Sequence, residues 1–326
     1  MPRFIARRAL LIASAILPML ALAQTDAEPK LPAMMKIVVP FGAGASNDAI
    51  ARAVAPLLAR RLGNTVIVEN KPGAAGVIGS DYVAKSPADG SVLLLSSSTF
   101  VTAAVTQPRL PYDPLTAFVP VSMVGNGPML LAVSAATPIK SAAELVAAAK
   151  AKPGSLTYGT SGTGSIAHLA SEMLSDAAGI RMTHVPYKGA AEIAVDLIGG
   201  RVDLSSDVTM LQYVKQGKAK LLATASRKRL ADFPDVPTLA ESGVPDPRST
   251  GTWFGAFAPK GTPAPVIDKL AAAFERALKN PDVIARMQPY AMSPAFAGPA
   301  AFEKQWASDY ELYGKTIREL DLKLEN

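Results

Sequence analysis

The sequence contains no cysteine and only two histidines and two tryptophans. Without cysteine the chain forms no disulfide and no thiolate metal site, so its fold depends on packed apolar cores. The two histidines, His168 and His184, do not stand at metal-ligand spacing with acids or cysteines. No grouping of nucleophile, base and acid appears along the chain either. We therefore expect no metal centre, no cofactor and no enzyme activity.

Long apolar runs and a strong charge imbalance are also missing. After the first 23 residues, Lys, Asp or Pro interrupts every apolar stretch well before the ~20 residues that a membrane-spanning helix needs. The formal net charge is +6, and three arginines among the first 23 residues leave +3, dispersed along the rest of the chain. This weak, dispersed charge gives no support to nucleic-acid binding.

Residues 1–23 have the pattern of a cleavable secretory signal peptide. Arg3, Arg7 and Arg8 precede the apolar stretch LLIASAILPMLALA, and residues 21–23 fit the small-residue cleavage pattern A-x-A. We predict cleavage after Ala23. Because no cysteine follows this point, the mature chain is expected to be released rather than lipid-anchored. A short membrane anchor is the alternative interpretation.

The remaining chain, about 300 residues, exceeds what one core usually fills, which favours two lobes. From Lys36 onward, short Val/Ile/Leu runs alternate with alanine-rich segments of helical spacing, as in parallel sheets covered by helices. Proline-rich stretches at 107–120 and 232–248 separate two such series. We predict an α/β protein with lobe 1 at 24–126, lobe 2 at 127–249, and a return to lobe 1 at 250–326.

Two polar loops rich in small residues, Gly42 to Asp48 and Thr160 to Ser165, each lie between an expected strand and an expected helix. Such a loop directs unpaired backbone N–H groups and the positive end of a helix dipole at one point, which suits an anion without any cationic side chain. The alternative is that Ser46 or Asn47, and Thr163 or Ser165, only cap the helices. Because ligands of α/β proteins gather at the carboxyl ends of strands, we predict that both loops bind one ligand.

Three further features have two interpretations each. Asp207 follows an apolar strand and either faces a ligand amine or hydroxyl in the cleft or caps the next helix. The segment NKPGAAGVIGS at 70–80 permits close backbone approach, either for tight helix-to-sheet packing or for ligand contact. Trp253 and Phe254 are assigned to the core rather than to a pocket.

Two enzyme patterns are matched only weakly. The Gly-x-Gly beginning at Gly42 has Asn47 where a dinucleotide-binding loop needs a small residue, although Glu69 ends the next strand where a ribose-binding acid belongs. The loop at 162–167 completes the glycine pattern, but no acid closes its following strand. A nucleophile elbow around Ser161 would require glycine where Thr163 stands. A dinucleotide-dependent enzyme or a hydrolase is therefore not favoured.

A series of ordered motifs resembles the Bug family, the substrate-binding components of tripartite tricarboxylate transporters. The motifs include IVVPFGAGASNDAIAR, VIVENKPGAAGVIGSDYVAKSPADG, LTYGTSGTGSIAHLASEML, THVPYKGAA and WFGAFAPKGTPAPVIDKL, and the resemblance extends from about Lys36 to Leu320. It implies a type II periplasmic-binding-protein fold with two α/β lobes around a ligand cleft. It also implies a periplasmic, monomeric protein that delivers a small carboxylate to membrane transporter subunits; activation of a membrane sensor is the alternative role.

The family motifs and the loop arguments together give one set of predicted ligand-binding residues: Phe41, Gly42, Ala43, Gly44, Ala45, Ser46, Asp48, Thr160, Ser161, Gly162, Thr163, Gly164, Ser165, His168 and Asp207. A buried or capping role is the alternative for His168. The first loop departs from the family, which usually has two prolines followed by three glycines. Because this loop has fewer glycines and an added hydroxyl at Ser46, we expect it to bind the nearest ligand carboxylate differently from the usual loop of the family.

Overall fold

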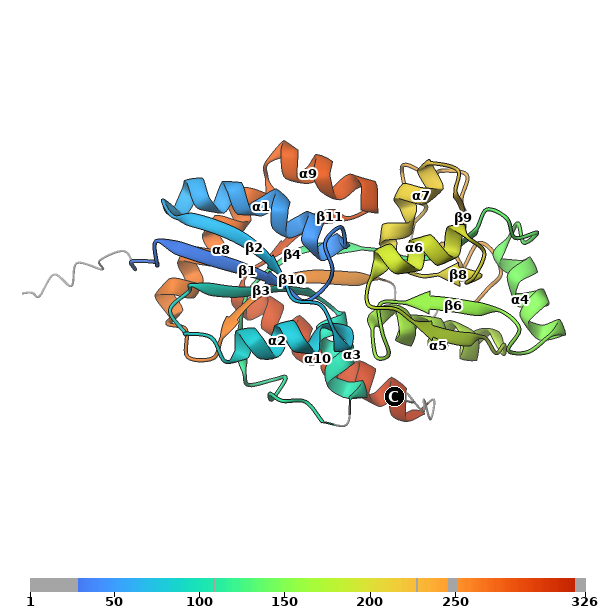
Figure 1. Ribbon diagram of the computed structural model, residues 1–326, viewed down its shortest axis with the longest axis horizontal. Helices are drawn as coiled ribbons and strands as arrows, with labels where there is room; N and C mark the ends of the chain where they lie inside the picture. The colour runs from blue at the N-terminus through green and yellow to red at the C-terminus, as the bar shows by residue number, and fades with distance from the viewer. Residues whose placement is uncertain (1–28, 108, 227, 246–250, 320–326) are drawn as a thin grey trace, which may run out of the picture.

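The computed structural model describes residues 29–107, 109–226, 228–245 and 251–319. The predicted signal peptide and its cleavage site lie outside these residues. The described chain forms two lobes, each with its own mixed sheet (Figure 1). Within the described ranges, no helix is both long and apolar enough to cross a bilayer.

Lobe 1 contains a six-stranded sheet of order β11-β4-β10-β3-β1-β2. Its strands are β1 (Met34–Val39), β2 (Thr65–Asn70), β3 (Val92–Ser97), β4 (Phe118–Gly127), β10 (Thr252–Pro259) and β11 (Ser293–Ala297). Its helices are α1 (Ser46–Leu62), η1 (Ala74–Gly76), α2 (Val77–Ala84), α3 (Thr99–Thr106), α8 (Ala264–Leu278), α9 (Pro281–Met287), η3 (Gln288–Tyr290) and α10 (Pro299–Glu319).

Lobe 2 contains a five-stranded sheet of order β7-β6-β8-β5-β9. Its strands are β5 (Met129–Ser134), β6 (Thr157–Thr160), β7 (Thr183–Pro186), β8 (Leu204–Ser205) and β9 (Ala219–Ala225). Its helices are α4 (Ala142–Ala151), α5 (Ile166–Ala178), α6 (Ala190–Ile198), η2 (Val208–Met210) and α7 (Leu211–Lys215).

The sheets are mixed rather than parallel as expected. In each lobe, the strand that enters from the other lobe, β5 or β10, lies antiparallel between two neighbours. A strand arriving directly needs no crossover helix, so nothing forces it to run parallel to its neighbours. The expected connector at 107–120 also contains the start of β4, where Pro120 stands opposite Phe257 beside an irregularity in the register.

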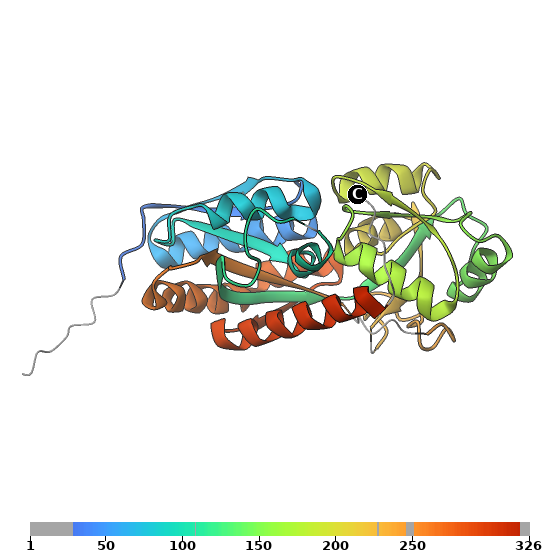
Figure 2. The same ribbon diagram turned by 90° about the horizontal axis from the view of Figure 1, so that it is seen from below.

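Alternate residues of the central strands face two helical layers. Ile37 of β1 packs in a cluster with residues of α1, α8 and α9, whereas Val38 packs on the opposite side with residues of α2, α3 and α10 (Figures 1 and 2). This is the period of two that places successive side chains on opposite faces of a strand. The cluster that contains Val38 also includes Tyr158 and Leu169 of lobe 2, so the two lobes share apolar packing.

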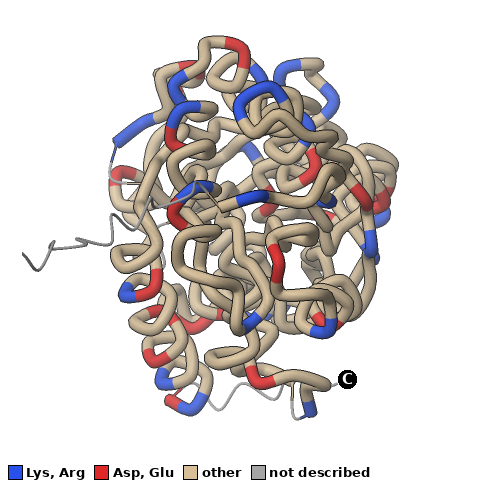
Figure 3. Tube along the Cα trace, turned by 90° about the vertical axis from the view of Figure 1, so that its left-hand side faces the viewer, with Lys and Arg blue, Asp and Glu red and all other residues tan. Residues whose placement is uncertain are grey.

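Two chain crossings connect the lobes. The first passes directly from β4 to β5 at Pro128, and the second lies between β9 and β10. The crossings touch, because a Cβ built on Gly251 would stand 2.5 Å from the carbonyl oxygen of Gly127. The predicted lobe boundary at 126/127 falls beside the first crossing, whereas the boundary at 249/250 lies outside the described residues. Positive and negative residues are interspersed along the trace (Figure 3).

Candidate functional site

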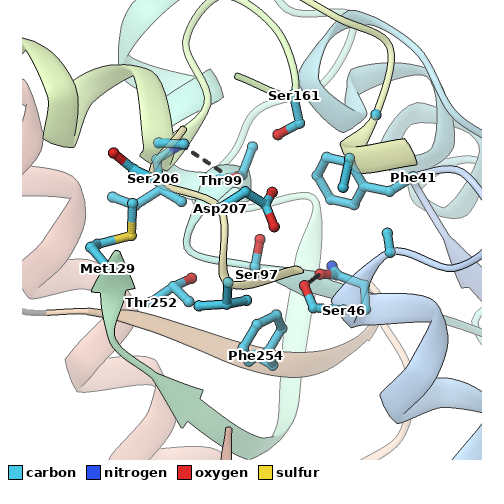
Figure 4. Close-up of a pocket in the computed structure, with 17 residues that line it drawn as sticks. Phe41, Ser46, Ser97, Thr99, Met129, Ser161, Ser206, Asp207, Thr252 and Phe254 are labelled. Carbon is cyan, nitrogen blue, oxygen red and sulfur yellow. Dashed lines mark hydrogen bonds between the residues drawn. The ribbon is translucent and has the colours of Figure 1, made fainter. Parts of the chain in front are cut away.

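A pocket lies between the lobes, at the ends of the strands where β1, β3, β6 and β8 pass into their helices. Its empty volume is about 510 Å³, counting the space at its mouth. Lobe 1 contributes Phe41, Ala45, Ser46, Asn47, Ser97, Thr99, Thr252 and Phe254. Lobe 2 contributes Met129, Ser161, Ile166, Ala167, Gly189, Ala190, Ser206, Asp207 and Val208. Figure 4 shows these side chains around one space.

The pocket receives the first residues of helices from both lobes. Ser46 and Asn47 begin α1, Thr99 begins α3, Ile166 begins α5 and Ala190 begins α6. The first backbone N–H groups of a helix have no partner within the helix, and the macrodipole makes this end positive. Among the described residues, no Lys, Arg or His lines the pocket, so the converging helix ends are the source of positive potential that these residues provide.

The loop before α1 is shaped by residues behind the pocket. Gly44 has a φ of +82°, a conformation that favours glycine, and its N–H donates to the Asp48 carboxylate at 3.0 Å. Arg52 and Asn70 also donate to Asp48. Burial alone would raise the pKa of the Asp48 carboxyl, but the bonds from Arg52, Gly44 and Asn70 lower it overall. Asp48 therefore remains ionised and fixes the loop instead of lining the pocket.

The first turn of α1 lacks a side-chain cap. The N-cap residue is Ala45, so neither Ser46 nor Asn47 occupies the capping position. Asn47 is only 3 % exposed, and its side-chain nitrogen Nδ2 is buried without a hydrogen-bond partner among the described residues. A buried donor without a partner costs free energy. Because Asn47 also lines the pocket, we expect a ligand acceptor to pair with it.

The loop before α5 is capped, unlike the loop before α1. Ser165 is the N-cap, and its hydroxyl accepts the N–H of His168 at 3.2 Å. The capping alternative therefore holds for Ser165. Gly162 and Gly164 have φ values of +116° and +80°, which glycine tolerates. The N–H of Ile166 donates to Oγ1 of Thr99 in lobe 1 at 3.2 Å (dashed in Figure 4).

The two histidines form a stacked pair under this loop. The ring centroids of His168 and His184 are 3.8 Å apart with an interplanar angle of 10°. His168 accepts the N–H of Gly164 at its Nδ1, and Nε2 of His184 lies 2.6 Å from Oγ1 of Thr160. Burial, with a smaller effect from His184, lowers the pKa of His168 to about 3, and burial lowers the pKa of His184 to about 4. Two neutral imidazoles thus hold the loop before α5 through hydrogen bonds with Gly164 and Thr160.

Asp207 is the only ionisable residue among the described residues that line the pocket. Its Oδ1 accepts the N–H of Thr209 at 2.8 Å and a second hydrogen bond from the Thr209 hydroxyl, so it caps η2. Burial raises the pKa of the Asp207 carboxyl, although the bonds from Thr209 oppose this effect. Asp207 therefore caps η2 and also lines the pocket, so its two interpretations do not exclude each other.

The predicted site residues fall into three groups. Those that line the pocket are Phe41, Ala45, Ser46, Ser161 and Asp207. Gly162 and Thr163 line a neighbouring cavity that also contains Ser161, Gly73, Ala75 and Lys188. The pocket-lining set does not include Gly42, Ala43, Gly44, Asp48, Thr160, Gly164, Ser165 or His168, which form or support the two loops.

Several pocket residues were missing from the prediction. Ser97 is the last residue of β3, Thr99 begins α3, Ser206 follows β8, and Thr252 and Phe254 lie on β10. The hydroxyl-rich run SSST after an apolar strand is a signal that could have identified Ser97 and Thr99. Phe254 belongs to the buried core, as expected, and its ring also forms part of the pocket wall. Trp253 is buried, and its Nε1 donates to Asp309 at 2.6 Å.

The residues considered for other functions in the sequence have structural roles or line the neighbouring cavity. Glu69, the residue considered for a ribose, instead pairs with Lys36 at 3.2 Å and Lys71 at 2.7 Å. The segment 70–80 has two roles: Gly79 packs against the backbone of Pro40, whereas Gly73 to Ala75 line the neighbouring cavity. Among the described residues, no group of three or more His, Cys, Asp or Glu could hold a metal ion.

Comparisons with known proteins agree with this architecture. BugT of Bordetella pertussis is 37% identical over 304 residues, covering 92% of this chain and 92% of BugT. Rpa4515 of R. palustris, solved with adipate, has a TM-score of 0.84 and 31% identity, covering 88% of this chain and 97% of that one. MatC of Rhodopseudomonas palustris, solved with bound malate, has a TM-score of 0.81 and 29% identity, with 87% and 98% covered.

The sequence profile of the tripartite tricarboxylate transporter family receptor matches residues 50–322. This match covers most of the chain and includes the helices α3, α5 and α6, whose first residues line the pocket, whereas Ser46 and Asn47 of α1 precede the matched range. It confirms the resemblance that the ordered motifs predicted. The chain belongs to the Bug family of tripartite tricarboxylate transporter receptors, which are periplasmic solute-binding proteins.

Proposed function

We propose that this protein captures a small carboxylate between its two lobes in the periplasm and delivers it to the membrane subunits of a tripartite tricarboxylate transporter. The observation that carries the proposal is the convergence of helix N-termini from both lobes on one pocket, whose described lining residues include no basic side chain. Oriented backbone N–H groups bind anions well in such a site. No step in this function requires catalysis or a cofactor.

The chemistry of the pocket suits a carboxylate of small size. The unpartnered Nδ2 of Asn47 and the hydroxyl of Ser46 stand at the positive end of α1, where carboxylate oxygens would accept hydrogen bonds. The hydroxyls of Ser97, Thr99 and Ser161 add further donors. Adipate in Rpa4515 and malate in MatC are carboxylates, which supports the same ligand class for this chain.

Contacts between the lobes support a mechanism of closure over the ligand. The bond from Ile166 to Thr99 joins the lobes, and a Cβ built on Gly162 would lie 3.4 Å from the backbone nitrogen of Ala75. A ligand that touches both lobes binds the closed state better than the open state and therefore shifts the population toward closure. We infer that transporter subunits recognise the closed surface and that the protein acts as a monomer.

Calorimetry and thermal melting of the purified protein with mono-, di- and tricarboxylates test this proposal. The matched controls are the neutral amides of the same acids, which lack the negative charge that helix N-termini favour. A carboxylate present at a hundredfold excess over its Kd should stabilise the fold by about 2.7 kcal/mol. If no acid binds, or if each amide binds as well as its acid, the proposal is wrong.

A further inference from the structure

The charge distribution inside the pocket is asymmetric. Of the 17 lining residues, Asp207 alone is ionisable, and it is an acid. Two described basic residues beside the loops are engaged or outside the pocket: Arg52 pairs with Asp48, and Lys188 lines the neighbouring cavity. Among the described residues, a ligand in this pocket therefore meets positive helix ends and one negative side chain, and no side-chain cation.

Asp207 has an oxygen available for a ligand. Thr209 occupies Oδ1, and within the described part of the chain Oδ2 has no hydrogen-bond partner. Figure 4 shows the carboxylate of Asp207 projecting into the pocket between Ser161 and Ser97. Burial raises the pKa of Asp207, so the protein alone does not compensate the charge of this carboxylate.

The other lobe offers the opposite chemistry. The Nδ2 of Asn47 is a buried donor without a partner, and it belongs to the first turn of α1, where the dipole favours a negative group. A ligand carboxylate would accept a hydrogen bond from this Nδ2. A second carboxylate facing Asp207 would place two like charges together in a partly desolvated space, whereas an ammonium group would neutralise Asp207 and donate to Oδ2.

From this pairing of an unsatisfied donor with an uncompensated acid, we propose that the ligand carries an ammonium group as well as a carboxylate, the ammonium group contacting Asp207 and the carboxylate contacting Asn47. This inference rests on the proposed function and narrows its substrate class from carboxylates in general to amino acids and related zwitterions. Simple dicarboxylates such as adipate are then poor ligands of this chain.

The test compares matched ligands by calorimetry on the unaltered protein. Straight-chain acids from propionate to hexanoate are each measured beside the acid with a terminal ammonium group, its α-amino counterpart, and the dicarboxylate of the same length. At one length or more, an ammonium-bearing acid should bind at least about tenfold more tightly than both the plain acid and the dicarboxylate. Adipate and malate are included as further comparisons.

Asp207→Asn supplies the second arm of the test. The amide keeps an oxygen that accepts from Thr209, so the cap on η2 is retained while the charge is lost. The affinity for the ammonium-bearing acid should fall about tenfold or more, whereas the affinity for the plain acid should not fall, because the variant removes a negative charge that repels a carboxylate. Asp176→Asn, an exposed position on α5, is the control with the same change of charge.

The outcomes separate this inference from the function on which it rests. If dicarboxylates bind more tightly than ammonium-bearing acids at every length, or if Asp207→Asn leaves both affinities unchanged, the ammonium site is refuted while carboxylate binding stands. If no acid of any kind binds, the proposed function fails as well. The ligand comparison on the unaltered protein decides between these outcomes even if the Asp207 variant is unstable.

Discussion

The backbone N–H of Ile166 donates a hydrogen bond to Oγ1 of Thr99 at 3.2 Å, and this bond connects the first turn of α5 in lobe 2 to the first turn of α3 in lobe 1. Both residues also line the pocket. The N–H belongs to the group of helix-start donors that would otherwise have no partner. One contact therefore joins the lobes and forms part of the pocket wall.

Thr99→Val should weaken ligand binding by disfavouring closure. Valine has nearly the shape of threonine but cannot accept the bond from Ile166, which leaves that N–H unpaired when the lobes are closed. We expect a loss of affinity of about two- to tenfold, corresponding to about 0.5–1.5 kcal/mol. Small-angle scattering without ligand should also show a larger radius of gyration.

Thr102→Val is the matched control for this prediction. The substitution is the same and lies on the same helix, but the Thr102 hydroxyl donates only to the Thr99 carbonyl within lobe 1. Equal effects of the two substitutions on affinity would contradict a role for Thr99 in closure.

Asn47→Ala should reduce carboxylate affinity without destabilising the ligand-free protein. The change removes a buried donor that has no partner among the described residues, so the folded state loses no strong hydrogen bond. A hydrogen bond to a charged ligand contributes about 1.5–3 kcal/mol, which predicts a loss of tenfold or more in affinity. Asn47→Asp should abolish binding, because it places a negative charge beside the ligand carboxylate. Calorimetry measures the affinities, and thermal melting measures the stability.

The stability of the fold should fall as the pH is lowered from about 7 to 5. His168 and His184 are the two histidines of the chain, and burial keeps both pKa values, about 3 and about 4, below the unfolded value of about 6.5. Below pH 6.5 the unfolded chain binds protons that the folded chain excludes, so the stabilisation present above this pH is lost as the pH falls toward 4. With two histidines the slope near pH 5 approaches about 2.7 kcal/mol per pH unit.

His184→Asn tests the origin of this slope. Asparagine offers a polar side chain near Thr160 but does not titrate, so the slope of unfolding free energy between pH 7 and 5 should fall to about half. Urea unfolding at a series of pH values measures the slope. A slope that is unchanged in the variant would show that other groups control the pH dependence.

Gly79→Ala should destabilise lobe 1. A Cβ at this position would stand 2.8 Å from the carbonyl oxygen of Lys71 and 2.8 Å from Cα of Pro40, both backbone atoms that yield only if α2 moves off the sheet. Overpacking of this kind costs about 1–3 kcal/mol. The comparison is Gly314→Ala within α10, whose Cβ would meet only side-chain atoms, at 3.4 Å or more. That variant should be neutral or more stable, because alanine is the better helix former, and urea unfolding measures both.

The local elements were the most predictable part of this protein. The strands around Met129, Thr157 and Thr252 and the helices at 46–62, 264–278 and 299–319 follow from short apolar patterns with turn residues beside them. The start of β4 was not predictable in this way, since Pro120 lacks an N–H and usually argues against a strand. Its pairing with Phe257 on β10 supplies the context that overrides this preference.

The candidate site was predicted in part. The glycine-rich loops were located from their composition, yet Asp48, Ser165 and His168 turn inward to shape and support those loops. Phe254 was assigned to the core because a buried aromatic ring on a strand gives the same sequence pattern whether it faces other side chains or a pocket.

The sequence by itself determined the alternation of strands and helices, the two polar loops at helix starts, and the family, because these properties are encoded within short segments and in their order. Only the tertiary structure decided which polar groups meet. Asn47 and Asp207 are far apart in the sequence, and both line one pocket because β1, β3, β6 and β8, which are not consecutive in the chain, lie side by side in pairs within their sheets. Strand order, which local pattern does not encode, places the unsatisfied donor of one lobe and the uncompensated acid of the other in the same pocket.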